Sequence, residues 1–262
     1  MSSHCERSVV RFDDVTKVFS AGTFRRRVVR ALDGVSFSVG QGDVLGLIGP
    51  NRAGKTTLVK ILLSICRPTS GRIQRLGRDW RIRSTLARVG YVHESQAFPR
   101  YLTARSLMEY YGALSQQPAG VVRRRAGELL EQVGLADRSR EPIGQFSKGM
   151  LQRLAVAQAL VNDPVLLVLD EPSEGMDLAA RRLLHQIIRE RQEQGHTAIL
   201  VSHLLSDVER LCSRVAVLRN GRLGFIGRVD ELKRKADADE PDAASSSIFE
   251  NALEPYYAGA VQ

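Results

Sequence analysis

The sequence predicts an α/β protein with a parallel sheet, and three apolar runs support this prediction. Val44–Ile48, Val165–Leu169 and Ala198–Val201 are short, almost wholly apolar segments, as expected for strands buried on both faces of a sheet. A helical pattern follows each of the three. This alternation of buried strands and helices is typical of doubly wound α/β folds.

The first apolar run leads into a glycine-rich turn with a strong chemical signature. Gly49 ends the run, and Gly54, Lys55 and Thr56 complete the pattern G-x-x-x-x-G-K-[ST] ahead of a helical segment, Thr57–Cys66. Glycines let backbone N–H groups turn inward around an anion, and the helix directs its positive end at that anion. We therefore expect a phosphate-binding loop in which Lys55 reaches the β- and γ-phosphates and the Thr56 hydroxyl ligates Mg²⁺.

The segments around this loop predict an antiparallel sheet beside the parallel one. Val9–Phe19 reads as a strand, and Val35, Phe37 and Val39 alternate with serines as in a half-buried strand. Further short strands are expected near Gly71–Leu76 and Val89–Val92. Arg67-Pro68 should stop the helix that follows the phosphate loop.

The middle of the chain predicts helices, and its end predicts a hairpin and a flexible tail. From about Leu102 to Ala136, apolar residues recur at helical spacing, among them Leu107, Tyr110, Tyr111 and Leu114. This spacing places the tyrosines in the core rather than in a cofactor site. Ser147 and Asp177 are good N-caps for the helices that follow them. Asn220-Gly221 predicts a β-hairpin turn, and the biased segment from Ala236 to Ser247 predicts flexibility.

Charged side chains follow two of the apolar strands. Asp170 and Glu171 come directly after one strand, and His203 comes after another. Ligands of such sheets bind at the carboxyl ends of the strands. We expect Asp170 to help hold Mg²⁺, Glu171 to orient or deprotonate a water that attacks the γ-phosphate, and His203 to sense that phosphate.

Composition limits the cellular setting and the classes of partner. The 262 residues are 43% hydrophobic, carry a formal net charge of +9 and include three widely spaced cysteines. No metal pattern, disulfide framework, signal peptide or membrane-spanning run is visible, which predicts a cytoplasmic protein. The arginines are not interleaved with aromatic residues as in a base-stacking groove, so no nucleic acid is expected as a partner.

In this order, the motifs resemble those of the nucleotide-binding subunits of ABC transporters, over roughly Val9 to Lys233. GPNRAGKTT is similar to the family's phosphate loop and VLLVLDEP to its second nucleotide motif. FSKGM resembles the signature sequence, SEGMD the D-loop, and His203 the switch histidine. Phe19 falls where the family places an aromatic residue that stacks on adenine.

The resemblance implies a P-loop NTPase with a RecA-like core, an antiparallel β subdomain and an α-helical subdomain at about 96–144. The ATP-binding domain then covers 8–233, and 234–262 forms a flexible C-terminal tail. The cofactors implied are ATP and Mg²⁺. Two subunits, most simply a homodimer, would close head to tail, with ATP between the Lys55 loop of one and the Ser147 helix start of the other. A separate transmembrane permease would hold the protein at the inner face of the cell membrane.

The resemblance also assigns roles to individual residues. Those implied in catalysis are Lys55, Glu171 and His203. Those implied in holding Mg²⁺ are Thr56, Glu94 and Asp170. Those implied in nucleotide binding are Phe19, Gly49, Asn51, Arg52, Ala53, Gly54, Lys55, Thr56, Thr57, Glu94, Ser147, Gly149 and Asp177.

Four positions depart from the common family pattern. Arg52 replaces a usual glycine of the phosphate loop, Glu94 replaces a usual glutamine, and Lys148 and Met150 alter the signature. Glu94 together with SKGM resembles bacterial ABC-2-type exporters, so the expected function is an ATPase that powers an exporter by ATP-driven dimer closure.

Two alternative functions stay open. One is a non-transport ABC ATPase that acts on DNA or the ribosome, which the basic charge favours, although the chain has no room for long coiled coils or a second nucleotide domain. The other is a regulatory subunit that binds ATP but hydrolyses it poorly because of Arg52.

Overall fold

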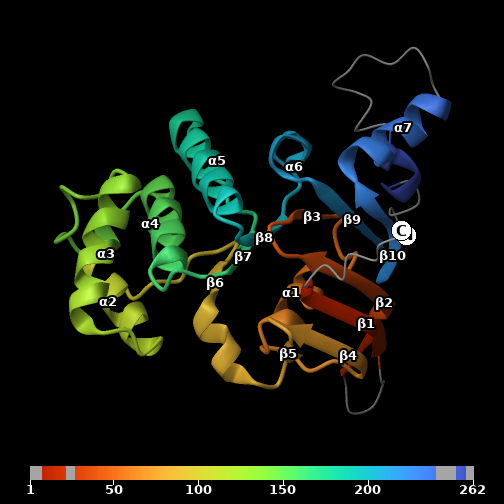
Figure 1. Ribbon diagram of the computed structural model, residues 1–262, viewed down its shortest axis with the longest axis horizontal. Coiled ribbons are helices and arrows are strands. Elements are labelled where there is room, and N and C mark those ends of the chain that lie inside the picture. Colours follow the sequence, from red (N-terminus) through yellow and green to blue (C-terminus); the bar gives the residue numbers. More distant parts are fainter. Residues whose placement is uncertain (1–7, 22–26, 240–251, 258–262) are drawn as a thin grey trace. The chain divides into compact units, whose positions relative to one another are not determined.

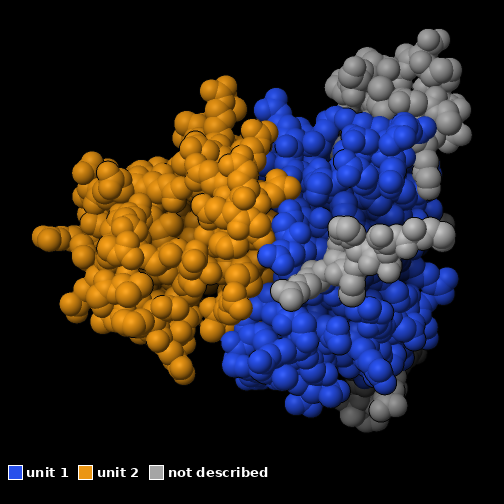
Figure 2. Space-filling model, in the orientation of Figure 1, with its two compact units in different colours: residues 1–85, 199–262 blue, residues 86–198 orange. Residues whose placement is uncertain are grey.

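The protein is described by a computed structural model that covers residues 8–21, 27–239 and 252–257 (Figure 1). The chain divides into two compact units. Unit 1 comprises Met1–Thr85 and Ile199–Gln262, and unit 2 comprises Leu86–Ala198 (Figure 2). The chain returns from unit 2 to unit 1 inside strand β8 (Thr197–Val201), all of which is buried.

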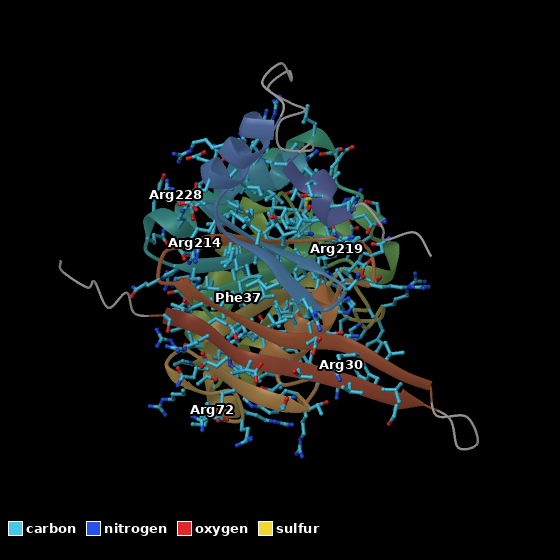
Figure 3. All side chains as sticks on the ribbon, turned by 90° about the vertical axis from the view of Figure 1, so that its right-hand side faces the viewer. Arg30, Phe37, Arg72, Arg214, Arg219 and Arg228 are labelled. Atoms are coloured by element: carbon cyan, nitrogen blue, oxygen red, sulfur yellow. The ribbon has the colours of Figure 1, made fainter. Side chains whose placement is uncertain are left out.

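An antiparallel sheet forms one half of unit 1. Its strands have the order β2-β1-β4-β5, and their bounds are β1 Ser8–Ala21, β2 Arg27–Gly40, β4 Ser70–Arg75 and β5 Arg78–Asp79. The predicted strands near the N-terminus are confirmed. Phe12 and Phe37 pack with their ring centroids 4.9 Å apart, and burying one such ring stabilises the fold by about 2 kcal/mol. Arg30 and Arg72 of this sheet are exposed and point outward (Figure 3).

A second set of strands in unit 1 carries the phosphate loop. Strand β3 (Val44–Ile48) is buried along its whole length and pairs in parallel with β9 (Arg214–Arg219). β9 continues into β10 (Arg222–Arg228) through an antiparallel hairpin. Asn220 and Gly221 at its turn have φ values of 49° and 78°, the conformation that two-residue hairpins need. The predicted hairpin is confirmed.

Helix α1 (Lys55–Leu62) starts and ends earlier than the sequence suggested. Its end is set by Ser64, which has a φ of 59°. With the chain turned in this way, the N–H groups of Ile65 and Cys66 both bond to the carbonyl of Lys60. A left-handed residue that closes a helix in this manner is a common C-terminal cap, so the helix stops before Arg67-Pro68 is reached.

Unit 2 combines two parallel strands with a group of helices. β6 (Val89–Val92) pairs in parallel with β7 (Leu166–Asp170). The elements outside these strands are η1 Arg83–Arg88, which crosses the unit boundary, α2 Ala104–Leu114, α3 Ala119–Gln132, η2 Ile143–Gln145, α4 Lys148–Leu160 and α5 Leu178–Glu193. Thr103, Ser147 and Asp177 each cap a helix through a side-chain oxygen.

The helices α2 and α3 occupy the segment that the sequence assigned to the helical subdomain. Gly112 allows them to approach closely, because a Cβ at that position would lie 2.3 Å from a methyl group of Val122. Leu107 is fully buried, as expected. Tyr110 and Leu114, which we expected in the core, are more than half exposed, since the apolar stripe of α2 is narrower than the sequence spacing suggested.

The end of the chain is more ordered than its composition predicted. Helix α6 (Leu205–Leu211) precedes the hairpin, and α7 (Val229–Asp239) extends beyond the expected start of the tail. Residues 252–257 are helical, and Leu253 is buried. Arg219 donates a hydrogen bond of 2.8 Å to the carbonyl of Pro255. The segment 240–251, which holds most of the biased stretch, lies outside the described residues.

Among the residues described, no helix has both the length and the apolar character needed to cross a bilayer.

Candidate functional site

The phosphate loop lies between β3 and α1 in unit 1, and its two glycines are required by their surroundings. Gly49 has a φ of 144° and Gly54 a φ of 108°. A Cβ on Gly49 would lie 2.1 Å from the carbonyl oxygen of Leu218, and a Cβ on Gly54 would lie 2.6 Å from that of Ala31. Any other residue at either position would force the backbone apart.

The turn of the β9–β10 hairpin fastens this loop to strand β2. Gly221 donates its N–H to the carbonyl of Ala53 at 3.0 Å, and the N–H of Asp33 donates to the carbonyl of Gly221 at 2.8 Å. Sequence reasoning missed this role for Gly221, because the hairpin lies far along the chain. These two backbone hydrogen bonds therefore connect the phosphate loop, through Gly221, to β2.

Lys55 folds back over the loop that precedes it. Its Nζ donates to the carbonyl of Gly49 at 2.5 Å and to that of Pro50 at 3.0 Å. The side chain is half-buried, while Asn51, Arg52 and Thr56 are exposed, Thr57 is half-buried and Ala53 is buried. The ammonium group thus lies where an anion in the loop would meet it.

The N-terminus of α1 suits an anion. Gly54 occupies the N-cap and offers no side-chain bond, and the first turn holds no acidic residue. The N–H groups of that turn and the helix dipole therefore add positive potential to that of the Lys55 ammonium.

Arg52 has an unusual backbone for a residue other than glycine. Its φ is 66°, and its side chain is exposed. Within the described part of the chain, its guanidinium forms no hydrogen bond or ion pair. A left-handed conformation costs an arginine about 1 kcal/mol relative to glycine, so the loop holds strain at this position.

The two other nucleotide-site predictions for unit 1 fall on Phe19 and His203. Phe19 lies in β1 with its ring 44% exposed, and the ammonium of Lys17 lies 4.7 Å from the ring centroid. His203 is exposed just after β8. Ser202 shapes this turn, because its Oγ accepts a hydrogen bond of 3.0 Å from the N–H of Leu204.

In unit 2, β7 delivers the two predicted carboxylates to its C-terminal end. Asp170 is the last residue of the strand and is only 2% exposed. Glu171 follows with a φ of 49°. A glutamate with a left-handed backbone conformation is rare, and such strained residues are found most often at functional sites.

Tyr91 lies near Asp170 and Glu94 and was not among the predicted residues. Burial raises the pKa of its hydroxyl, and the negative charges of Asp170 and Glu94 raise it further. β6 pairs with β7, with Val92 opposite Leu169, so Glu94 and Asp170 lie at neighbouring strand ends. The available signal was the position of Tyr91 on the strand that leads to Glu94. Tyr91 belongs to no recognisable sequence motif, so the sequence alone did not single it out.

The signature segment and the D-loop meet within unit 2. Ser147 caps α4 by accepting a hydrogen bond of 3.3 Å from the N–H of Met150, and Asp177 caps α5 by accepting one of 2.8 Å from Ala180. Lys148 pairs with Glu174 at 2.6 Å. A Cβ on Gly149 would come within 3.3 Å of the carbonyl of Gly175, so the two segments touch.

The predicted site residues thus gather in two groups. Unit 1 holds the phosphate loop, Phe19 and His203, while unit 2 holds Asp170, Glu171, Glu94, Ser147 and Asp177. Among the described residues, no three histidine, cysteine or acidic side chains cluster as a self-contained metal site. The joint use of the two groups by one nucleotide stays a prediction.

Comparison with known proteins matches residues 32–174 to the ABC transporter family. An uncharacterized ABC transporter ATP-binding protein of Nostoc is 44% identical over 227 residues, which cover 86% of this chain and 68% of the relative. A Nod factor export ATP-binding protein of Ralstonia nicotianae is 36% identical, over 83% of this chain and 69% of the relative. The chain spans about two thirds of the length of such curated relatives.

A solved structure of an ATP-binding subunit of an ABC transporter superposes with a TM-score of 0.82 at 25% identity. The match covers 94% of this chain and 100% of that one. The predicted α/β class and P-loop NTPase fold are confirmed.

Proposed function

We propose a function from the premise that the chain belongs to the ABC transporter family: it binds ATP at the Lys55 loop, and hydrolysis of that ATP drives a membrane exporter. One observation carries the proposal. Lys55 bridges the carbonyls of Gly49 and Pro50 above an uncapped helix N-terminus, which forms a ready cradle for the phosphates of a nucleotide.

Different residues of this chain have different roles in ATP hydrolysis. The loop N–H groups and Lys55 hold the β- and γ-phosphates and neutralise charge that develops on them. Glu171 accepts a proton from the attacking water as the water oxygen bonds to the γ-phosphorus. The bond between that phosphorus and the β–γ bridging oxygen breaks, which leaves ADP and phosphate.

The donor set also fits Mg²⁺, which prefers oxygen ligands. The oxygens would come from Thr56, Asp170 and Glu94, and the effect of both carboxylates on Tyr91 supports their proximity to each other. When bound, Mg²⁺ would neutralise phosphate charge. Asp170 is buried, which suits a carboxylate whose charge is balanced by a cation.

Two further partners belong to the proposal. A second copy of the chain would present its capped Ser147 helix start to the nucleotide, so that ATP closes a dimer. A transmembrane permease would hold the subunit at the inner face of the membrane. Export is supported by the similarity to a Nod factor export ATP-binding protein.

The test compares the wild-type protein with Glu171→Gln. We expect steady-state ATP hydrolysis to fall by about 100-fold or more in this variant, whereas ATP binding is retained and ATP-bound dimers accumulate. Equal and negligible rates in the two proteins would contradict hydrolysis and favour the regulatory ATP binder.

The cellular role needs a separate measurement. We expect the chain to co-purify with membranes through a permease. Recovery with ribosomes or DNA, with none in the membrane fraction, would instead favour a non-transport ATPase.

A further inference from the structure

Unit 1 has a second cation-rich hollow at the opposite end of α1 from the phosphate loop. A pocket of about 510 Å³ opens between the segment after α1 and the segment after β5. Its volume lies in the range of small-molecule sites. The lining residues that matter here are Ser64, Arg67, Thr69, Trp80, Arg81 and Arg83. The eight residues of α1 place this pocket about 12 Å along the helix from the loop.

The arginines of the pocket have unusually few partners. All three are exposed, and within the described residues the guanidinium groups of Arg67 and Arg83 form no hydrogen bond or ion pair. Arg81 has one loose contact with Asp79 at 4.0 Å and lies 5.8 Å from the ring centroid of Trp80. The pocket lining itself includes no aspartate or glutamate, so the charges of Arg67 and Arg83 are not balanced within it, whereas Asp79 offsets part of the charge of Arg81.

A buried arginine beneath the pocket adds to this potential. Arg75 is fully buried. Its guanidinium donates to Thr85 Oγ1 at 2.8 Å, to the carbonyls of Leu62, Trp80 and Ile82, and to Ser64 Oγ. Every one of these acceptors is neutral, so the charge is hydrogen-bonded without being balanced by a carboxylate. Such a charge acts over a longer range than one in water.

The same bonds make the pocket rigid. Arg75 ties Ser64 to Trp80, and Ser64 Oγ donates to the carbonyl of Trp80 at 2.7 Å. On the other wall, the N–H of Thr69 bonds to the carbonyl of Thr16 at 2.8 Å, and Thr69 Oγ1 accepts from Val18 at 2.9 Å. The arginines therefore project from fixed walls, which lowers the entropy cost of binding.

We propose that this pocket binds a phosphate-bearing anion at a site separate from the phosphate loop. A guanidinium fork matches the geometry of phosphate oxygens. The two unpaired guanidinium groups of Arg67 and Arg83, with Arg81 in the same lining, suit a ligand with more than one negative charge. Trp80 and Pro68 add apolar surface for the part of the ligand that carries the phosphate. The source is either a free phosphorylated molecule or an acidic lipid headgroup.

Trp80 supplies the readout, because it is the single tryptophan of the chain and lines the pocket. The probe is inorganic pyrophosphate, titrated while tryptophan fluorescence is followed. Since pyrophosphate also suits the phosphate loop, the titration uses both the wild type and Lys55→Ala. We expect the fluorescence change to persist in Lys55→Ala with an affinity within about twofold of the wild type, and to weaken as salt is added.

Charge-neutral variants test the pocket itself. Arg67→Gln combined with Arg83→Gln should weaken pyrophosphate binding about tenfold or more. Arg72, which lies on β4 and is labelled in Figure 3, does not line the pocket. Arg72→Gln should therefore change pyrophosphate affinity less than about twofold. Equal effects in both variants would show that only the overall charge matters, and a signal lost in Lys55→Ala would place the anion in the phosphate loop. Either result overturns the proposal.

Flotation with vesicles distinguishes the sources. Binding to vesicles that contain phosphatidylglycerol, weakened by the double variant and absent with phosphatidylcholine alone, identifies a lipid headgroup. Pyrophosphate binding without vesicle binding identifies a free phosphorylated ligand. Tighter binding of a polyglutamate peptide than of either probe would overturn the assignment to phosphate and indicate an acidic protein segment.

Discussion

The two ends of α1 present positive charge in different ways. At the N-terminal end, Gly49 and Gly54 shape the backbone, the helix dipole supplies much of the field, and a single Lys55 completes it. At the C-terminal end the dipole is negative, and Arg75 covers the carbonyl of Leu62. Positive charge there comes from the side chains of Arg67 and Arg81, which lie outside the helices and strands, and of Arg83, the first residue of η1.

This difference shows how visible each kind of site is in a sequence. A backbone cradle needs glycines at fixed spacing, so it leaves a motif. A binding site made of side chains needs only that several arginines or lysines surround the same pocket. Many different spacings of these residues along the chain satisfy this requirement, so no motif results. Substitutions of Lys55, Arg75, Arg52 and Ser64 test the contrast, from the largest expected effect to the smallest.

Lys55→Ala should affect only the N-terminal end. We expect ATP affinity, measured by calorimetry, to fall about 100-fold, because a charge-assisted contact to phosphate in a preformed site contributes about 2–3 kcal/mol. Lys60→Ala removes an exposed charge from the same helix and should leave ATP affinity within about twofold. If both variants lose affinity equally, Lys55 has no special position in the loop.

Arg75→Met should affect the C-terminal end. Truncation leaves the carbonyls of Leu62, Trp80 and Ile82 without their buried donor. We expect the free energy of unfolding, from urea titration, to fall by about 3 kcal/mol.

Arg72→Met is the matched control for this change, since Arg72 is exposed on the same strand. A loss below about 1 kcal/mol in Arg75→Met would show that the buried hydrogen bonds contribute little.

The smallest effects concern the left-handed residues near the two ends, Arg52 and Ser64. Arg52→Gly relieves backbone strain with no bond lost, so we expect a gain in stability of up to about 1 kcal/mol, together with faster ATP hydrolysis if Arg52 restrains the loop. Ser64→Gly also relieves strain but loses the bonds to Trp80 and Arg75, so we expect a loss of about 1 kcal/mol. Effects of the same sign in urea titrations would contradict this reasoning.

Much of the fold was predictable because its signals are local. The apolar runs of β3 and β7, the Asn220-Gly221 turn, and the Ser147 and Asp177 caps all rest on neighbouring residues, and each was found in the structure. The core positions Tyr110 and Leu114 were wrong, because helical spacing alone does not say how wide a stripe the neighbouring helices cover.

The residues of the candidate site also differ in whether their signals are local in the sequence. The positions of Asp170 and Glu171 were predictable, because both residues lie at a strand end, and the position of Lys55 was predictable, because it follows a glycine-rich motif at the start of a helix. Gly221 and Tyr91 were not, since their roles depend on segments that are distant along the chain. The backbone strain at Glu171 was also invisible, as φ depends on how the segments around the residue pack.

By itself, the sequence determined the phosphate loop, the strand-end carboxylates and the helix caps, because their chemistry depends on spacing over a few residues. Only the tertiary structure decided that Gly221 fastens the loop, that Tyr91 lies near Asp170 and Glu94, and that Arg67, Arg81 and Arg83 line one pocket above Arg75. The physical reason is that burial and charge density depend on distances in space, which short motifs do not encode.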